Sequence, residues 1–208
     1  TVFHGYLDLL LSNNEVELEK LQEILQHMSG QTARMERLVE DLLLLAKLES
    51  VEPDVSKHSE QSVAVLFKEV ANDAASLSEG QHEISIDVDD TFIVLGDPHE
   101  LRSAVSNLVF NAVRYTPERG KIELCGYTKN DSLVIEVRDN GIGIAEKHIS
   151  RITQRFYRVD KSRKYRGQGG TGLGLAIVKH VAIRHHAELQ IESECGQGSV
   201  FRLLFPVF

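Results

Sequence analysis

The chain has 208 residues, a formal net charge of −8 and 42% hydrophobic residues. This size and composition allow one or two domains with a sizeable core. The acidic balance argues against a general nucleic-acid-binding protein, which would be basic. No apolar run approaches membrane-spanning length. Cys125 and Cys195 lack metal-type spacing, so we expect two buried free thiols. Because the sequence opens at Thr1 within a helical pattern, we expect a piece of a longer protein.

Residues 1–50 predict two helices. Apolar residues recur at helical spacing over residues 3–11, and the polar run 12–14 provides a break with capping chemistry. Over residues 15–49 the apolar positions alternate steps of three and four, as in a heptad pattern: Leu18, Leu21, Leu25, Met28, Thr32, Met35, Val39, Leu42 and Ala46. A helix this long needs partners. We expect a helical hairpin that dimerises into a four-helix bundle; packing on the chain's own second domain is the alternative.

Residues 51–58 predict a linker, because Pro53 ends the preceding helix. The remainder mixes helices and strands. We predict helices at 62–77, 97–115 and 171–186, and strands at 83–88, 91–95, 121–128, 132–138, 189–194 and 199–205. Asp97 and Pro98 supply the cap and first turn of the second of these helices. This order predicts an α+β fold in which helices cover one face of a sheet.

The predicted helix at 97–115 carries two stripes. Its core stripe is Leu101, Val105, Leu108 and Ala112. A second stripe holds Asn107, Asn111, Arg114 and Tyr115. Asparagine is a poor helix-interior residue, and two of them one turn apart beside a cation and an aromatic ring indicate a ligand face. An amide oxygen suits Mg²⁺, a guanidinium suits a phosphate, and the tyrosine could stack on a base. For this stripe alone, a solvated helix side is an equal alternative.

Two glycine-rich segments follow. "DNGIGI" at 139–144 is first of all a turn. The Asp139 carboxylate could also accept a hydrogen bond from an exocyclic amine while the glycines pass close to a flat ring. "GQGGTGLGLAIVKH" at 167–180 places five glycines before a helix predicted to begin near Thr171. We interpret it as a phosphate cradle, because helix N-termini offer unpaired N–H groups. It matches neither the P-loop nor the dinucleotide fingerprint.

The intervening segment 151–166 is strongly basic, with seven cationic residues and one anionic residue. It also contains Phe156 and Tyr157. Such a concentration of positive charge attracts a polyanion, and its place before a glycine-rich hinge suggests a mobile lid. A solvated surface and a nucleic-acid patch are the alternatives, and the acidic surroundings disfavour the second.

Four motifs, "NLVFNAVRYTP", "DNGIGI", "RFYRVDKSR" and "GQGGTGLGLAIVKH", occur in the order and spacing seen in sensor histidine kinases. They resemble that family's asparagine box, first glycine box, phenylalanine box and second glycine box. The resemblance covers essentially the whole chain, because residues 1–50 are similar to the family's dimerisation and phosphotransfer hairpin. It implies a Bergerat-type α/β sandwich ATP-binding domain at 59–208, after a truncated hairpin at 1–50 and a linker at 51–58.

The resemblance implies a protein-histidine kinase that binds ATP and Mg²⁺. Such enzymes transfer the γ-phosphoryl group to a histidine and then to an aspartate of a response-regulator receiver domain. Two alternatives are a related Bergerat-fold ATPase of the chaperone or mismatch-repair type, and an ATP-binding dimerisation and docking module without kinase activity. The resemblance further implies a homodimer formed through the hairpin, no nucleic-acid partner, and the cytoplasmic portion of a bacterial protein anchored in the inner membrane.

By the same resemblance, four residues are catalytic: Asn107, Asn111, Arg114 and Arg158. Asn111 would bind Mg²⁺, Asn107 would support the phosphate–metal network, and both arginines would meet phosphate oxygens. Arg114 departs from the lysine that the family often has there, which preserves charge but not geometry.

The other implied nucleotide contacts begin with Tyr115, which would pack against the adenine, and Asp139, which would accept a hydrogen bond from its amino group. The rest are Gly141, Gly143, Tyr157, Lys161, Gly170, Thr171, Gly172, Leu173 and Gly174.

The family's phosphoacceptor stretch, similar to His-Glu-Leu-Arg-Thr-Pro-Leu, does not occur in this sequence. We expect it to precede Thr1. His4 is followed by Gly5 and Tyr6 rather than by an acidic residue, so we do not expect it to be the acceptor. The chain should therefore bind Mg²⁺-ATP without phosphorylating itself.

Overall fold

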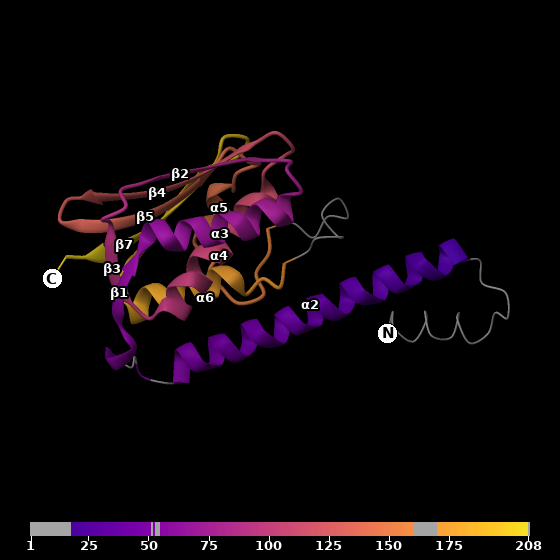
Figure 1. The fold of residues 1–208 in the computed structure, drawn as a ribbon, viewed down its shortest axis with the longest axis horizontal. Coiled ribbons are helices and arrows are strands. Elements are labelled where there is room, and N and C mark those ends of the chain that lie inside the picture. Colours follow the sequence, from indigo (N-terminus) through magenta and orange to yellow (C-terminus); the bar gives the residue numbers. More distant parts are fainter. Residues whose placement is uncertain (1–17, 51, 53–54, 160–169, 208) are drawn as a thin grey trace. The chain divides into compact units, whose positions relative to one another are not determined.

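The structure is a computed structural model that describes residues 18–50, 52, 55–159 and 170–207 (Figure 1). It divides into two compact units, residues 1–43 and 44–208, and each is described by itself. The helix predicted over residues 1–11 lies outside the described residues.

Helix α2 (Leu18–Ser50) is a single helix of 33 residues. In the first unit its heptad positions Leu25, Met35, Val39 and Leu42 are exposed, by 37% to 61%. Within the described residues, no helix combines the length and the apolar character needed to cross a membrane. A short 3-10 helix, η1 (Val55–Lys57), follows in the predicted linker.

The second unit contains a mixed sheet of five strands. In spatial order these are β2 (Glu83–Val88), β4 (Lys121–Lys129), β5 (Ser132–Asp139), β7 (Gly198–Pro206) and β6 (Glu188–Glu194). β2 pairs with β4 in parallel, and the other pairs are antiparallel. The predicted strands at 83–88, 121–128, 132–138, 189–194 and 199–205 are confirmed. A separate antiparallel pair, β1 (Ser59–Ser62) and β3 (Ile93–Gly96), includes a first strand that was not predicted.

Helices α3 (Val63–Ser78), α4 (Pro98–Tyr115) and α6 (Gly174–Arg184) cover one face of this sheet (Figure 1). The core between the layers includes Phe67, Leu101, Leu108, Ile122, Leu124, Ile135, Ile177 and Leu203, each at most 1% exposed. The predicted α+β class is therefore confirmed. A further helix of one turn, α5 (Glu146–Ile149), was not predicted.

Two sequence-based expectations need correction. The helix predicted to begin near Thr171 begins at Gly174, because Gly172 has φ +75° and a left-handed residue cannot belong to the helix. The expectation of two buried thiols is also wrong. Cys125 is half-buried, and Cys195 is exposed in the turn between β6 and β7.

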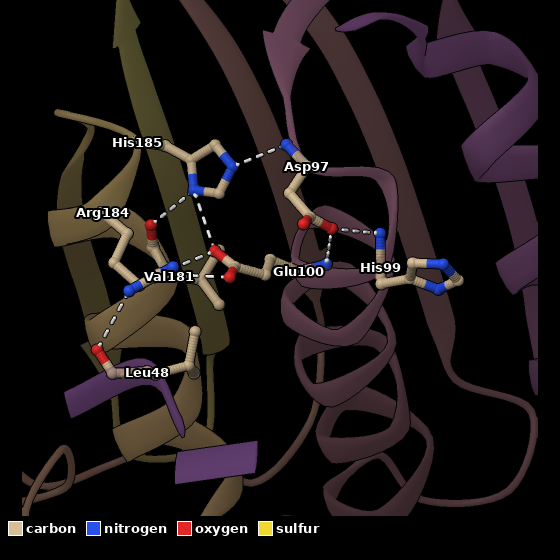
Figure 2. A network of polar contacts seen from close by, with 7 residues as sticks. All are labelled: Leu48, Asp97, His99, Glu100, Val181, Arg184 and His185. Carbon is tan, nitrogen blue, oxygen red and sulfur yellow. Dashed lines mark hydrogen bonds and ion pairs between the residues drawn. The ribbon is translucent and has the colours of Figure 1, made fainter. Parts of the chain in front are cut away.

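A buried polar network joins α4, α6 and the last turn of α2 (Figure 2). Arg184 donates from Nε to both carboxylate oxygens of Glu100, at 3.2 and 3.0 Å, and from Nη1 to the Leu48 carbonyl at 3.4 Å. Glu100 and Arg184 are only 3% and 8% exposed. Since Leu45 and Leu48 are buried in the same core, the last turns of α2 belong to the second unit.

His185 completes this network (Figure 2). Its Nε2 accepts the Asp97 N–H at 3.0 Å, so the ring proton lies on Nδ1, which donates to the Val181 carbonyl at 2.9 Å. Burial lowers the pKa of His185, which agrees with a neutral ring. His58 stacks on this ring with centroids 4.9 Å apart. The segment that follows α2 is thus attached to the end of α6.

Candidate nucleotide-binding site

One side of α4 presents the four polar and aromatic residues predicted as a ligand face: Asn107, Asn111, Arg114 and Tyr115. All four are half-buried. The helix itself begins as predicted, because the Asp97 carboxylate caps it by accepting the N–H groups of His99 at 2.9 Å and Glu100 at 3.2 Å. The predicted core stripe of α4 is buried. Because the polar stripe lies beside it on the helix, burial of the core stripe turns the polar stripe toward the edge of the core.

The second glycine segment lies against this side of α4. Asn107 donates from Nδ2 to the Ser103 carbonyl at 2.9 Å, and its Oδ1 lies so close to Gly174 that a Cβ on that glycine would overlap it. A Cβ on Gly170 would lie 2.5 Å from Nη1 of Arg114. The two ends of the segment 170–174 therefore lie against Arg114, predicted to bind phosphate oxygens, and Asn107, predicted to support the phosphate–metal network.

The first glycine segment meets the C-terminal end of the same helix. Ile142 donates its N–H to the Tyr115 carbonyl at 3.0 Å, which satisfies one of the last free carbonyls of α4. Gly141 donates its N–H to Oδ1 of Asp139 at 2.8 Å. A Cβ on Gly141 would overlap the Tyr115 carbonyl oxygen. Asp139, the last residue of β5, is thereby held beside Tyr115.

The Asp139 carboxyl is 7% exposed. Burial raises the pKa of Asp139 above its ordinary value, although hydrogen bonds from the backbone N–H groups of Gly141 and Ser199 oppose this rise. A carboxylate in such a place is costly to keep charged. A ligand that donates a further hydrogen bond to the Asp139 carboxylate would stabilise its charged form.

The backbone itself requires glycine at positions 143 and 172, whether or not a ligand is bound. Both have positive φ, +65° at Gly143 and +75° at Gly172. A Cβ at Gly143 would overlap the Glu194 carbonyl, and a Cβ at Gly172 would lie 2.9 Å from Cα of Phe156. These glycines let one backbone segment pass another. The sequence alone suggests only approach to a ligand, a flat ring at Gly143 and phosphates at Gly172.

The other predicted site residues that the structure describes lie in or beside the second glycine segment. Phe156 donates its N–H to the Gly172 carbonyl at 2.8 Å, which places the half-buried Tyr157 and Arg158 beside the second glycine segment. Oγ1 of Thr171 accepts the Leu173 N–H at 3.2 Å. The Leu173 side chain is fully buried, so only its backbone can face a ligand. Lys161 lies outside the described residues.

Sequence reasoning missed two residues that contact the predicted set. His148 lies 2.7 Å from the Tyr157 hydroxyl through Nδ1, and the guanidinium carbon of Arg151 is 4.5 Å from the centroid of the Tyr157 ring. Neither contact has a periodic signal, because α5 is a single turn and the residues that follow it up to 156 form turns and bends.

Residues 96–208 match the family described as Histidine kinase-, DNA gyrase B-, and HSP90-like ATPase. This match covers more than half of the chain, and the chain belongs to that family. It is 48% identical over 207 residues to the phosphate regulon sensor protein PhoR of Pseudomonas aeruginosa, a match that covers 99% of this chain and 46% of that protein. The chain spans about half the length of the curated relatives it matches.

Two solved structures resemble the fold closely. Full-length ShkA in complex with AMPPNP has a TM-score of 0.75 and 25% identity, covering 97% of this chain and 42% of ShkA. The histidine kinase AdeS of Acinetobacter baumannii has a TM-score of 0.73 and 19% identity, covering 99% of this chain and 93% of that chain. The predicted resemblance to sensor histidine kinases is confirmed.

Proposed function

We propose that this chain is the ATP-binding catalytic portion of a sensor histidine kinase. In the longer protein it would bind Mg²⁺-ATP and promote transfer of the γ-phosphoryl group to a histidine. The bond between the γ-phosphorus and the ADP oxygen breaks and a phosphorus–nitrogen bond forms, and the group then passes to a response-regulator aspartate. The observation that carries this proposal is the convergence of three segments, 107–115, 139–143 and 170–174, on one side of α4.

The donor set of these segments fits a metal-bound nucleoside triphosphate. At one end, the buried Asp139 carboxylate would accept the adenine amino group and Tyr115 would pack against the ring. At the other end, Asn111 would hold Mg²⁺ with support from Asn107. Bound Mg²⁺ neutralises charge on the phosphates as the γ-phosphoryl group leaves.

The cations of the site would meet the phosphate oxygens: Arg114, Arg158 and Lys161. Backbone N–H groups of the glycine segments would complete the contacts, with Gly141 and Gly143 near the base and Gly170, Thr171, Gly172, Leu173 and Gly174 near the phosphates. These roles depend on positioning and charge rather than on covalent chemistry by the protein.

The exposed heptad face of α2 supports a homodimer formed through the helical hairpin. Leu25, Met35, Val39 and Leu42 present their side chains to solvent in the single chain, and a partner helix would bury them. The similarity to PhoR supports a receiver domain as partner, phosphate-regulated signalling, and a cytoplasmic position in a protein anchored in the inner membrane.

Titration with Mg²⁺-AMPPNP tests the site. Asn111→Ala removes the metal ligand, and Asp139→Ala removes the adenine acceptor. Each should weaken binding at least about tenfold, because a hydrogen bond or ligand contact to a charged group is lost. Asn72→Ala, at an exposed asparagine of α3, is the matched control and should bind as the unchanged chain does. Unchanged affinity in both site variants would remove the assignment.

A second test follows the phosphoryl group itself. We expect the chain, incubated with ATP labelled in the γ-phosphate, to bind nucleotide without accumulating label at His4. Label on His4 would overturn the proposal that the acceptor histidine lies outside residues 1–208.

A further inference from the structure

The side chain of Tyr157 is fixed from two directions. Its hydroxyl lies 2.7 Å from Nδ1 of His148, in α5, and its ring lies under the Arg151 guanidinium at 4.5 Å. Tyr157 and His148 are both half-buried. A hydrogen bond at this depth competes less with water than one on an open surface.

The backbone at His148 is held in place by hydrogen bonds and by packing of a neighbouring residue. The His148 carbonyl accepts the N–H groups of Arg151 at 2.8 Å and Ile152 at 3.0 Å. Ile152 is 6% exposed and belongs to the core. His148 is therefore attached to the packed part of the second unit.

The turn at residues 154–158 has an unusual backbone. Phe156 has φ +61°, a left-handed conformation that a non-glycine residue adopts only when its surroundings impose it. Phe156 donates its N–H to the Gly172 carbonyl at 2.8 Å, and Tyr157 donates its N–H to the Gln154 carbonyl at 3.2 Å. Among the residues that the structure describes, the bond from Phe156 is the one backbone hydrogen bond found between the turn and the second glycine segment. The side-chain contact to His148 supplies a second point of attachment.

We propose that His148 is a positioning residue for the phosphate end of the nucleotide site. By holding the Tyr157 hydroxyl, it sets the direction in which the next residue, Arg158, leaves the turn. This inference rests on the proposed function, in which Arg158 meets phosphate oxygens. In this role His148 acts through Tyr157 rather than by direct contact with the nucleotide.

The test compares two nucleotides that differ at the phosphate end. In the full chain, His148→Ala should weaken Mg²⁺-AMPPNP about two- to tenfold, the effect of one lost hydrogen bond, and leave AMP affinity unchanged in a competition assay. Tyr157→Phe should reproduce this result. His148→Asn should restore binding, because its amide can reach the same hydroxyl. His99→Ala, at an exposed histidine, is the matched control.

The double variant His148→Ala/Tyr157→Phe should bind no more weakly than either single variant, since both remove the same contact. Three results would overturn the inference: unchanged Mg²⁺-AMPPNP affinity in His148→Ala, an equal loss for both nucleotides, or no recovery in His148→Asn. Failure of the unchanged chain to bind Mg²⁺-AMPPNP would instead overturn the proposed function, and the inference with it.

Discussion

The buried pair of Glu100 and Arg184 provides a quantitative test of how the second unit is held together. Arg184→Met removes the guanidinium and leaves the Glu100 carboxylate, 3% exposed, without its ion pair. Loss of one partner of a buried pair costs about 3–5 kcal/mol. For a domain of about 150–250 residues, each kcal/mol shifts Tm by about 2–4 °C. We therefore expect Tm to fall by about 6–20 °C.

Thermal unfolding followed by circular dichroism measures this shift. Arg102→Met is the matched control, because Arg102 pairs with Glu69 at 2.6 Å and Asp73 at 2.8 Å on the exposed side of α4. Exposed pairs contribute about 0–1 kcal/mol each. The double variant Glu100→Leu/Arg184→Met leaves no unpaired charge and should recover much of the lost Tm. A fall in Tm in Arg184→Met as small as that in Arg102→Met would contradict the expected cost of leaving Glu100 buried and unpaired.

Two further predictions concern the site. Gly174→Ala places a Cβ against Oδ1 of Asn107, so it should weaken Mg²⁺-AMPPNP binding in a calorimetric titration; unchanged affinity would show that this close approach does not matter. Burial raises the pKa of Asp139, so its carboxylate is lost as pH falls through that raised pKa. AMPPNP affinity should therefore begin to fall at a higher pH than an ordinary aspartate, with its pKa of 3.8, would produce. A pH series of titrations in which the fall begins no higher would contradict this.

Local sequence signals were sufficient for the main helices and strands. Helix α4 could be predicted from local sequence alone, because Asp97 caps it, Pro98 occupies its first turn, and its apolar residues recur at helical spacing. In β7 buried residues largely alternate with more exposed ones, as expected for a sheet with one covered face, whereas β5 is buried at four consecutive residues. β1 and α5 were not predicted, each for a different reason. The polar β1 forms by pairing with β3, and α5 is a single turn with no periodic pattern.

The candidate site was predictable at the level of its motifs and not at the level of its contacts. The order of the four motifs identified the residues through their resemblance to a family. The approach of Asn107 to Gly174 depends on how α4 and α6 pack, and these residues are far apart in the sequence. The same holds for the pair of Glu100 and Arg184, and for the hydrogen bond between His148 and Tyr157. Such contacts are products of tertiary packing, which sequence periodicity does not encode.

In the proposed site, three separated segments bind one metal-bound nucleoside triphosphate together. An NMR titration of the chain with Mg²⁺-AMPPNP can detect this joint binding by following the side-chain amide of Asn111 and the backbone amides of Gly141 and Gly172. We predict that all three signals shift along one saturation curve with a single Kd. Shifts confined to one of these segments, or saturating at different nucleotide concentrations, would contradict the claim.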